Sequence, residues 1–177
     1  MSTNQRLASW TIALNLPGFR VVHEHRETPK DPVRFTLVPT EEVGVCPHCH
    51  HASDTVHRRH HSKPIKDLPL SDQAVELIVS TPQYECERCK RFFTPPYPGI
   101  APGAHATERF LEYAARVIRF ADVANAASLL GVPEKTLGRW YYDYVQRQLD
   151  KAPAEGRKPI KSLGVDELSL KKSTGSS

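Results

Sequence analysis

Four cysteines in two Cys-x-x-Cys pairs are the residues of this chain whose type and spacing most clearly predict chemistry. The pairs are Cys46/Cys49 and Cys86/Cys89, and the sequence contains no other cysteine. Two intervening residues let both thiolates of a pair reach one ion, and two such pairs complete a tetrahedral shell around Zn²⁺. A complete shell leaves no coordination position for a substrate. The predicted zinc therefore has a structural role.

Disulfides, redox-active thiol pairs and unligated thiols are the alternatives to zinc. The segment Leu7–Leu16 is too short and too polar to be an export signal, so we expect a cytoplasmic protein. A reducing cytoplasm favours metal binding over disulfides. A histidine could replace one cysteine ligand, but four available thiolates make that arrangement the less favoured one. The candidate histidines are His48, His50 and His51.

Size and charge fit either one medium domain or two small ones. The chain has 177 residues, of which 39% are hydrophobic and 25% charged, and its 15 prolines predict many short elements. A formal net charge of +4 is compatible with nucleic-acid binding without requiring it. No apolar stretch approaches the roughly 20 residues of a membrane span, so no membrane partner is expected.

The amino-terminal half is predicted to be rich in β-structure. Residues 1–40 form a lead-in with a β-hairpin, because Phe19–Glu24 and Val33–Val38 alternate and carry β-branched residues. Residues 41–93 are predicted to be a zinc ribbon. The 36 residues between the two cysteine pairs leave room for an antiparallel meander. Its expected strands are Thr55–Lys63, Ile65–Leu70 and Gln73–Tyr84.

Residues 94–106 are rich in proline and glycine, which predicts a linker and a domain boundary. Beyond it the hydrophobic period becomes helical, and residues 107–150 are predicted to form three helices. Thr107 and Asp122 suit the N-caps of the first two helices. Pro133 suits the first position of the third, where its missing N–H costs nothing.

Val123–Tyr141 has the spacing of a helix-turn-helix. Gly131 permits the turn, and apolar positions bury the following helix against its predecessor. This geometry leaves the amino-terminal part of Val132–Leu149 free to enter a DNA major groove. The predicted DNA contacts are Lys135, Thr136 and Arg139, with Arg139 suited to a guanine edge. The alternative is an ordinary three-helix bundle, because residues 104–150 hold six Lys/Arg against six Asp/Glu.

The densest basic run lies between the cysteine pairs, at residues 57–63. On a strand, alternate side chains would face one way and could follow a phosphate backbone. The predicted phosphate contacts are Arg58, Arg59 and Lys63. A solvated loop is the equal alternative.

In their order, these motifs resemble the amino-terminal part of bacterial insertion-sequence transposases of the ISL-three family. The matching residues are Cys46-Pro47-x-Cys49, Lys66-Asp67-Leu68-Pro69-Leu70, Tyr84-x-Cys86-x-x-Cys89 followed by Phe92-Phe93, the helix-turn-helix, and Leu163-Gly164-Val165-Asp166-Glu167. The resemblance implies that the zinc ribbon and the helix-turn-helix recognise the terminal inverted repeats of a mobile element. It also implies a catalytic domain of RNase H-like fold, whose Asp-Asp-Glu triad holds two Mg²⁺ ions. Asp166 matches the first aspartate of that triad.

The departure from the family is at the carboxyl end. The sequence stops eleven residues past Asp166, without counterparts of the second aspartate and the glutamate. We therefore expect a linker at 151–162 and a truncated start of the RNase H-like domain at 163–177. Mg²⁺ would bind only in a full-length catalytic domain, so this chain alone is not expected to cut or join DNA.

The predicted fold class is α+β in several parts: a small β-rich zinc ribbon, a three-helix helix-turn-helix domain and a truncated RNase H-like first strand. The favoured function is the DNA-binding portion of a truncated transposase. Its expected DNA partner is the double-stranded terminal inverted repeats. Its expected protein partners are a second copy of this chain or a full-length transposase. The first alternative is a stand-alone zinc-ribbon and helix-turn-helix transcriptional regulator. Two more are a zinc-stapled protein-interaction module and an enzyme that takes its missing carboxylates from another chain.

Overall fold

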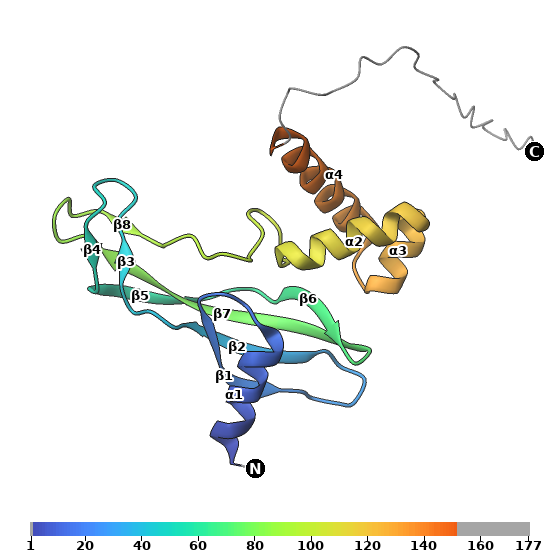
Figure 1. Cartoon of the computed structure of the whole chain (residues 1–177), viewed down its shortest axis with the longest axis horizontal. Helices are drawn as coiled ribbons and strands as arrows, with labels where there is room; N and C mark the ends of the chain where they lie inside the picture. The colour runs from blue at the N-terminus through green and yellow to red at the C-terminus, as the bar shows by residue number, and fades with distance from the viewer. Residues whose placement is uncertain (1, 152–177) are drawn as a thin grey trace, which may run out of the picture.

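The computed structural model describes residues 2–151, and a six-stranded β-sheet is the largest unit among them (Figure 1). Asp166 and the predicted RNase H-like segment lie outside the described residues. Within residues 2–151, no helix combines the length and the apolar character needed to cross a bilayer. The elements in chain order are α1 (Thr3–Leu14), β1 (Phe19–His25), β2 (Val33–Pro39), β3 (Gly44–Val45), β4 (Ala52–Ser53), β5 (Val56–His61), β6 (Ile65–Leu70), β7 (Gln73–Glu85), β8 (Phe92–Phe93), α2 (Glu108–Phe120), α3 (Val123–Leu130) and α4 (Glu134–Lys151).

The amino-terminal lead-in contains a helix, α1, before the predicted hairpin. Ser2 caps this helix in a capping box with Gln5, and Asn15 ends it in the left-handed conformation. Strands β1 and β2 then pair antiparallel, as the sequence predicted. Helix α1 packs on β1 and contributes Leu14 to a core that includes Phe35.

The long strand β7 organises the whole sheet. It pairs parallel with β2 and antiparallel with β5, β6 and β8, giving a six-stranded sheet with β1. Strands β3 and β4 form a separate two-stranded sheet. The pairing of β2 with β7 joins the hairpin of residues 1–40 to the strands of residues 41–93. The two predicted segments therefore share one sheet.

The buried face of β7 changes half-way along the strand. Val75, Leu77 and Val79 are buried in the core beneath α1, whereas Ser80 and Tyr84 are buried in the second half. Successive side chains of a strand point to opposite faces. The first half of β7 therefore serves the core that contains Phe35, and the end of the strand serves a separate core around the cysteines.

The proline-rich segment 94–106 packs against the sheet. Ala106 is fully buried and forms a parallel bridge with Lys66 on β6, and the backbone N–H of Lys66 donates to His105 O at 2.9 Å. Its composition prevents a helix or a continuous ladder, as predicted. Its backbone nevertheless bonds to β6, so the segment fixes the helices to the sheet.

Three helices, α2 to α4, follow at the predicted positions. Thr107 Oγ1 accepts from the backbone N–H of Phe110, and the Asp122 side chain accepts from that of Asn125, which confirms both predicted N-caps. Gly131 takes the left-handed conformation (φ 60°) between α3 and α4. Helix α4 begins at Glu134, two residues later than predicted, and extends to Lys151.

Candidate metal centre and nucleic-acid interface

The two cysteine knuckles share the same backbone fold. The first joins β3 to β4 and the second joins β7 to β8. The backbone N–H of His50 donates to Cys46 O at 2.9 Å, and that of Lys90 donates to Cys86 O at 2.8 Å. His50 and Lys90 both adopt the left-handed conformation, with φ of 56° and 57°. Each turn therefore points two thiols in one direction, toward the other knuckle.

The four sulfur atoms converge on one point. All four Sγ atoms lie within 4.8 Å of one another. The separation is 3.4 Å between Cys49 and Cys86 and 3.7 Å between Cys46 and Cys89. These thiols are free, since a disulfide needs about 2.05 Å. A zinc–sulfur bond of about 2.3 Å gives a tetrahedron with edges of about 3.8 Å, so the cluster has the size of a Zn(Cys)₄ site.

The electrostatics of the cluster also fit a dication. Backbone hydrogen bonding from Cys89 lowers the pKa of the Cys86 thiol to about 6. The pKa of Cys49 rises to about 12, because burial and the neighbouring thiols outweigh the backbone N–H of His51, which lowers it. Four thiolates at these distances repel one another unless a cation lies among them. The four cysteines could therefore bind Zn²⁺, which would supply folding energy rather than a reactive water.

A small aromatic core supports the knuckles from below. The rings of Tyr84 and Phe93 stack with centroids 5.7 Å apart, next to the buried Cys46 and Cys86. Gly44 lies so close that a Cβ atom there would be 2.7 Å from Tyr84 Cδ2. The first knuckle therefore needs glycine at this position to reach the second.

The structure places the predicted basic-run residues on an exposed edge. Every residue of β5 is exposed, as is Lys63 in the following turn. Arg58 Nε donates to Gln83 Oε1 at 2.8 Å, and Arg59 lies 3.9 Å from the carboxylate of Glu42. The run is a strand rather than a loop, with its side chains on the surface.

The predicted groove-contacting residues lie in the first two turns of α4. Lys135 and Arg139 are exposed, and Thr136 is half-buried. Leu137 and Trp140 are buried in the helical core, so the opposite side of α4 faces solvent. The structure does not bring these residues together with the basic run on β5, which pairs with the far half of β7.

One group of basic side chains was not predicted as a site. Arg88, Lys90 and Arg91, here named the knuckle patch, belong to the second knuckle and its exit, and all three are exposed. The Arg91 guanidinium lies 3.3 Å from His48 Nδ1 of the first knuckle. The run Arg-Cys-Lys-Arg at residues 88–91 is the sequence signal that predicts this patch.

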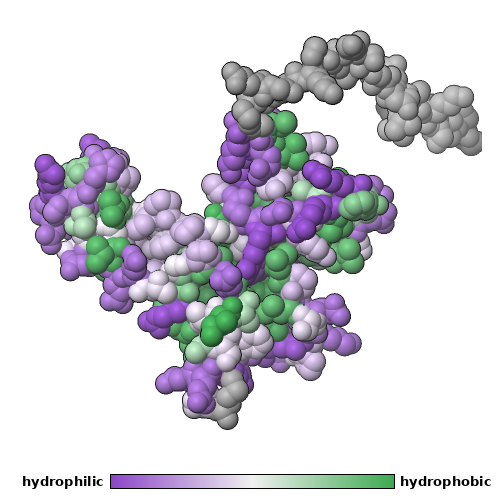
Figure 2. Space-filling model, in the orientation of Figure 1, coloured by the Kyte–Doolittle hydropathy of each residue, from purple (hydrophilic) through white to green (hydrophobic). Residues whose placement is uncertain are grey.

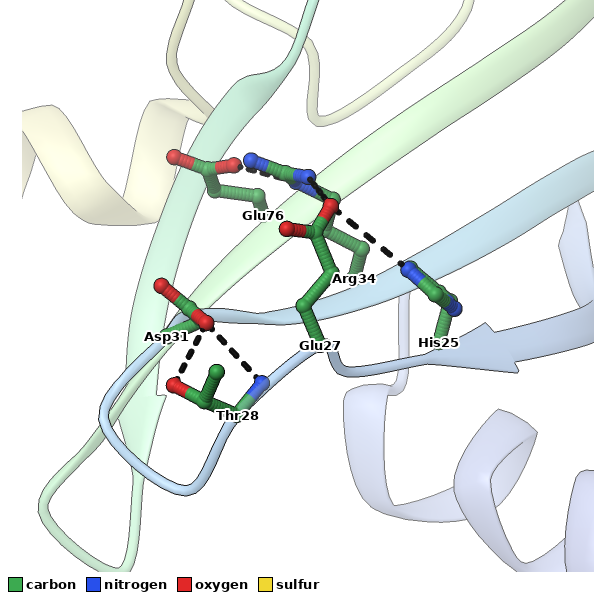
Figure 3. Close-up of polar contacts among 6 residues, drawn as sticks. All are labelled: His25, Glu27, Thr28, Asp31, Arg34 and Glu76. Carbon is green, nitrogen blue, oxygen red and sulfur yellow. Dashed lines mark hydrogen bonds and ion pairs between the residues drawn. The ribbon is translucent and has the colours of Figure 1, made fainter.

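A second polar cluster lies near the β1–β2 turn (Figure 3). Arg34 Nε is 3.0 Å from Glu76 Oε2, and Arg34 Nη1 is 3.4 Å from Glu27 Oε1. Asp31 accepts from the Thr28 hydroxyl, and this bond lowers the pKa of Asp31. Because Arg34 pairs with Glu27 beside the turn and with Glu76 on β7, this cluster ties the turn to β7.

One family model matches the segment that contains the four cysteines. Residues 42–89 match the family model described as the zinc-finger of transposase IS204/IS1001/IS1096/IS1165. The matched segment contains all four cysteines and supports the resemblance to ISL-three-type transposases over this part of the chain. The comparisons with curated proteins and with solved structures found no match.

Proposed function

We propose that this chain is the DNA-binding amino-terminal part of an insertion-sequence transposase. One structural Zn²⁺ joins the two knuckles, and α3 with α4 acts as a helix-turn-helix that recognises terminal inverted repeats. The observation that carries the proposal is the coincidence of the transposase zinc-finger match with a closed cluster of four cysteines. Asp166 would open the catalytic domain, with Mg²⁺ bound only when the remaining carboxylates are supplied.

The structural role of zinc follows from what surrounds the cluster. The small core beneath it contains only two aromatic side chains besides the cysteines, Tyr84 and Phe93. That is little apolar burial to hold two knuckles in place. A bound structural zinc contributes about 10–16 kcal/mol of apparent free energy in small modules, which is enough to decide whether this region folds.

DNA recognition is proposed for α4 because one side of this helix is buried and apolar, whereas the other side is exposed and carries basic side chains. The side that carries Leu137 packs on α3, and the Gly131 turn sets the angle between the two helices. Lys135 and Arg139 remain exposed near the amino end. An arginine there can bond both acceptors of a guanine in the major groove, and a lysine can contact a phosphate.

The test is binding to the ends of the element. Duplexes copied from the inverted repeats that flank the gene are compared with scrambled duplexes by fluorescence anisotropy. The intact protein is expected to prefer the repeats, and Arg139→Ala is expected to remove about 1–3 kcal/mol of that preference. Lys30→Ala is the matched control, because it removes one exposed positive charge from the β1–β2 turn.

Two results would contradict the proposal. Equal binding to repeats and scrambled DNA would remove specific recognition, and an Arg139→Ala variant that behaves like Lys30→Ala would remove the role of α4. Tight binding to a promoter instead of the element ends would favour the stand-alone transcriptional regulator.

A further inference from the structure

We propose that strand β7 sets the spacing of a two-part DNA site, in which the knuckle patch contacts phosphates about one helical turn from the groove that α4 enters. This inference rests on the proposed function and adds to it a second contact surface and a fixed distance. The family match covers residues 42–89, which include Arg88 but neither Lys90 nor Arg91, and it gives no spacing to α4.

The two surfaces lie at opposite ends of β7 (Figure 1). The second knuckle begins at Cys86, directly after the last residue of the strand. At the other end, Ala74 lines a cavity together with Leu130, the last residue of α3. Helix α4 begins only four residues later, at Glu134. One extended strand therefore separates the metal centre from the amino end of α4.

The length of that strand matches the repeat of B-DNA. β7 has 13 residues, which at about 3.3 Å per residue span roughly 40 Å. Contacts one helical turn apart on the same face of a duplex are about 34–36 Å apart. The twist of a real strand shortens its span, which brings the two distances closer together.

The connection between the two ends is rigid. Strands β2 and β6 pair with the first half of β7, and β5 pairs with the second half. At the helical end, Arg109 and Thr107 both hydrogen-bond the buried Asp67 on β6. Neither end is joined to the sheet by a free linker, so the spacing is a property of the fold.

The charge at the metal-centre end suits a phosphate backbone. Arg88, Lys90 and Arg91 are exposed, and the Arg91 guanidinium lies within hydrogen-bonding distance of His48. In Figure 2 this end of the molecule is a separate lobe that carries many hydrophilic residues, and it is well apart from the helical lobe. A rod-shaped polyanion that reaches both lobes would meet basic side chains at each of them.

The experiment measures affinity against duplex length. Fluorescein-labelled random-sequence duplexes of about 8 to 24 bp are titrated with the intact chain at constant salt. Duplexes near 10 bp can cover one surface only, whereas those above about 16 bp reach both. We expect affinity to rise about tenfold or more across this interval, beyond the proportional increase that extra binding positions give. Hydroxyl-radical footprints on longer DNA should show two protected patches about 10 bp apart.

Charge-neutral variants identify the second surface. Arg88→Gln/Lys90→Gln should remove the step, so that long duplexes bind as weakly as short ones, and should lower the salt slope by about 0.9 per lost phosphate contact. Lys30→Gln should retain both. Zinc content and circular dichroism of each variant confirm that the fold is kept.

The outcomes separate this inference from the function on which it rests. Smooth length dependence, or an unchanged step in Arg88→Gln/Lys90→Gln while Arg139→Ala still weakens binding, overturns the two-part site alone. Absence of binding to every duplex, at any length, instead overturns the proposed DNA-binding function together with it.

Discussion

Arg109 Nε donates to Asp67 Oδ1 at 2.7 Å, which joins the first turn of α2 to strand β6. Asp67 is fully buried, and its Oδ1 also accepts from the Thr107 hydroxyl at 2.7 Å. A second Arg109 nitrogen bonds Oδ2, and a third bonds the carbonyl of Leu14 at the end of α1. One guanidinium therefore connects α1, the sheet and the helical unit.

We predict that Arg109→Ala destabilises the protein by about 3–5 kcal/mol, because it leaves a buried carboxylate without its counter-charge. Urea denaturation measures the loss. Arg6→Ala is the matched control, since it breaks the exposed pair of Arg6 with Glu24, and should cost less than about 1 kcal/mol. Equal effects of the two substitutions would show that Asp67 does not depend on Arg109.

Removal of zinc is predicted to unfold one part of the molecule. The purified chain should contain one Zn²⁺ per polypeptide by elemental analysis. After chelation, amides near the knuckles should exchange rapidly, since Tyr84 and Phe93 alone hold little of that region. Amides of Val75–Val79 and of α2 to α4 should stay protected, because their cores lie elsewhere.

Cys89→Ser provides the matched variant, because it removes one half-buried ligand and keeps nearly the same volume. It should reproduce the exchange pattern of the chelated protein without chelator. A metal-free protein with full protection at the knuckles would contradict the structural role of zinc.

Substitution by alanine is predicted to have opposite effects on stability at Gly44 and at Gly138. Gly44→Ala places a Cβ atom 2.7 Å from the Tyr84 ring, so it should destabilise the knuckle region and weaken zinc binding. Gly138→Ala meets nothing closer than 3.8 Å, at Val123 Cγ1, inside helix α4. It should stabilise the helical unit by about 1 kcal/mol.

Thermal denaturation and zinc competition with a chromogenic chelator measure both variants. Stabilisation by Gly44→Ala would contradict the close approach of the first knuckle to Tyr84. A lower melting temperature for Gly138→Ala would contradict the open space at this position beside Val123.

The features that the sequence predicted well depend on short-range signals. Alternation predicted β1, β2 and β7, and Thr107 and Asp122 were confirmed as N-caps. The Cys-x-x-Cys spacing predicted the sulfur cluster, because each knuckle is a local turn. Each strand, cap and knuckle is a local feature. The approach of Cys46 to Cys89 joins positions 43 residues apart, and it could be predicted only because a tetrahedral zinc site needs both cysteine pairs.

The features that were missed depend on contacts between distant residues. Parallel pairing of β2 with β7 leaves no local pattern, so the sequence predicts the hairpin as a separate lead-in. The sequence predicts Asp67 only as part of the motif shared with the family. Its ion pair with Arg109 was missed, because the two residues lie 42 positions apart. The composition of the proline-rich segment predicts a linker, because it excludes regular structure. Composition does not predict that Ala106 is buried against the sheet.

The cap of α3 predicts a pH dependence. The Asp122 carboxylate accepts from the backbone N–H of Asn125 at 2.8 Å, and this bond lowers its pKa below the ordinary value of 3.8. The unfolded chain therefore binds the proton more tightly than the folded one. The stability from the charged cap is fully present above pH 3.8 and is lost as the pH falls through the lowered pKa.

Asp122→Asn isolates this contribution, because asparagine also caps a helix but does not ionise in this range. Unfolding free energies of both proteins are measured by urea denaturation from neutral to acidic pH. The difference in unfolding free energy between the two proteins should be constant near neutrality. At acidic pH the unsubstituted protein should lose stability relative to Asp122→Asn. Parallel curves throughout the acidic range would show that the carboxylate charge of Asp122 does not stabilise α3, and that the cap acts through its hydrogen bond alone.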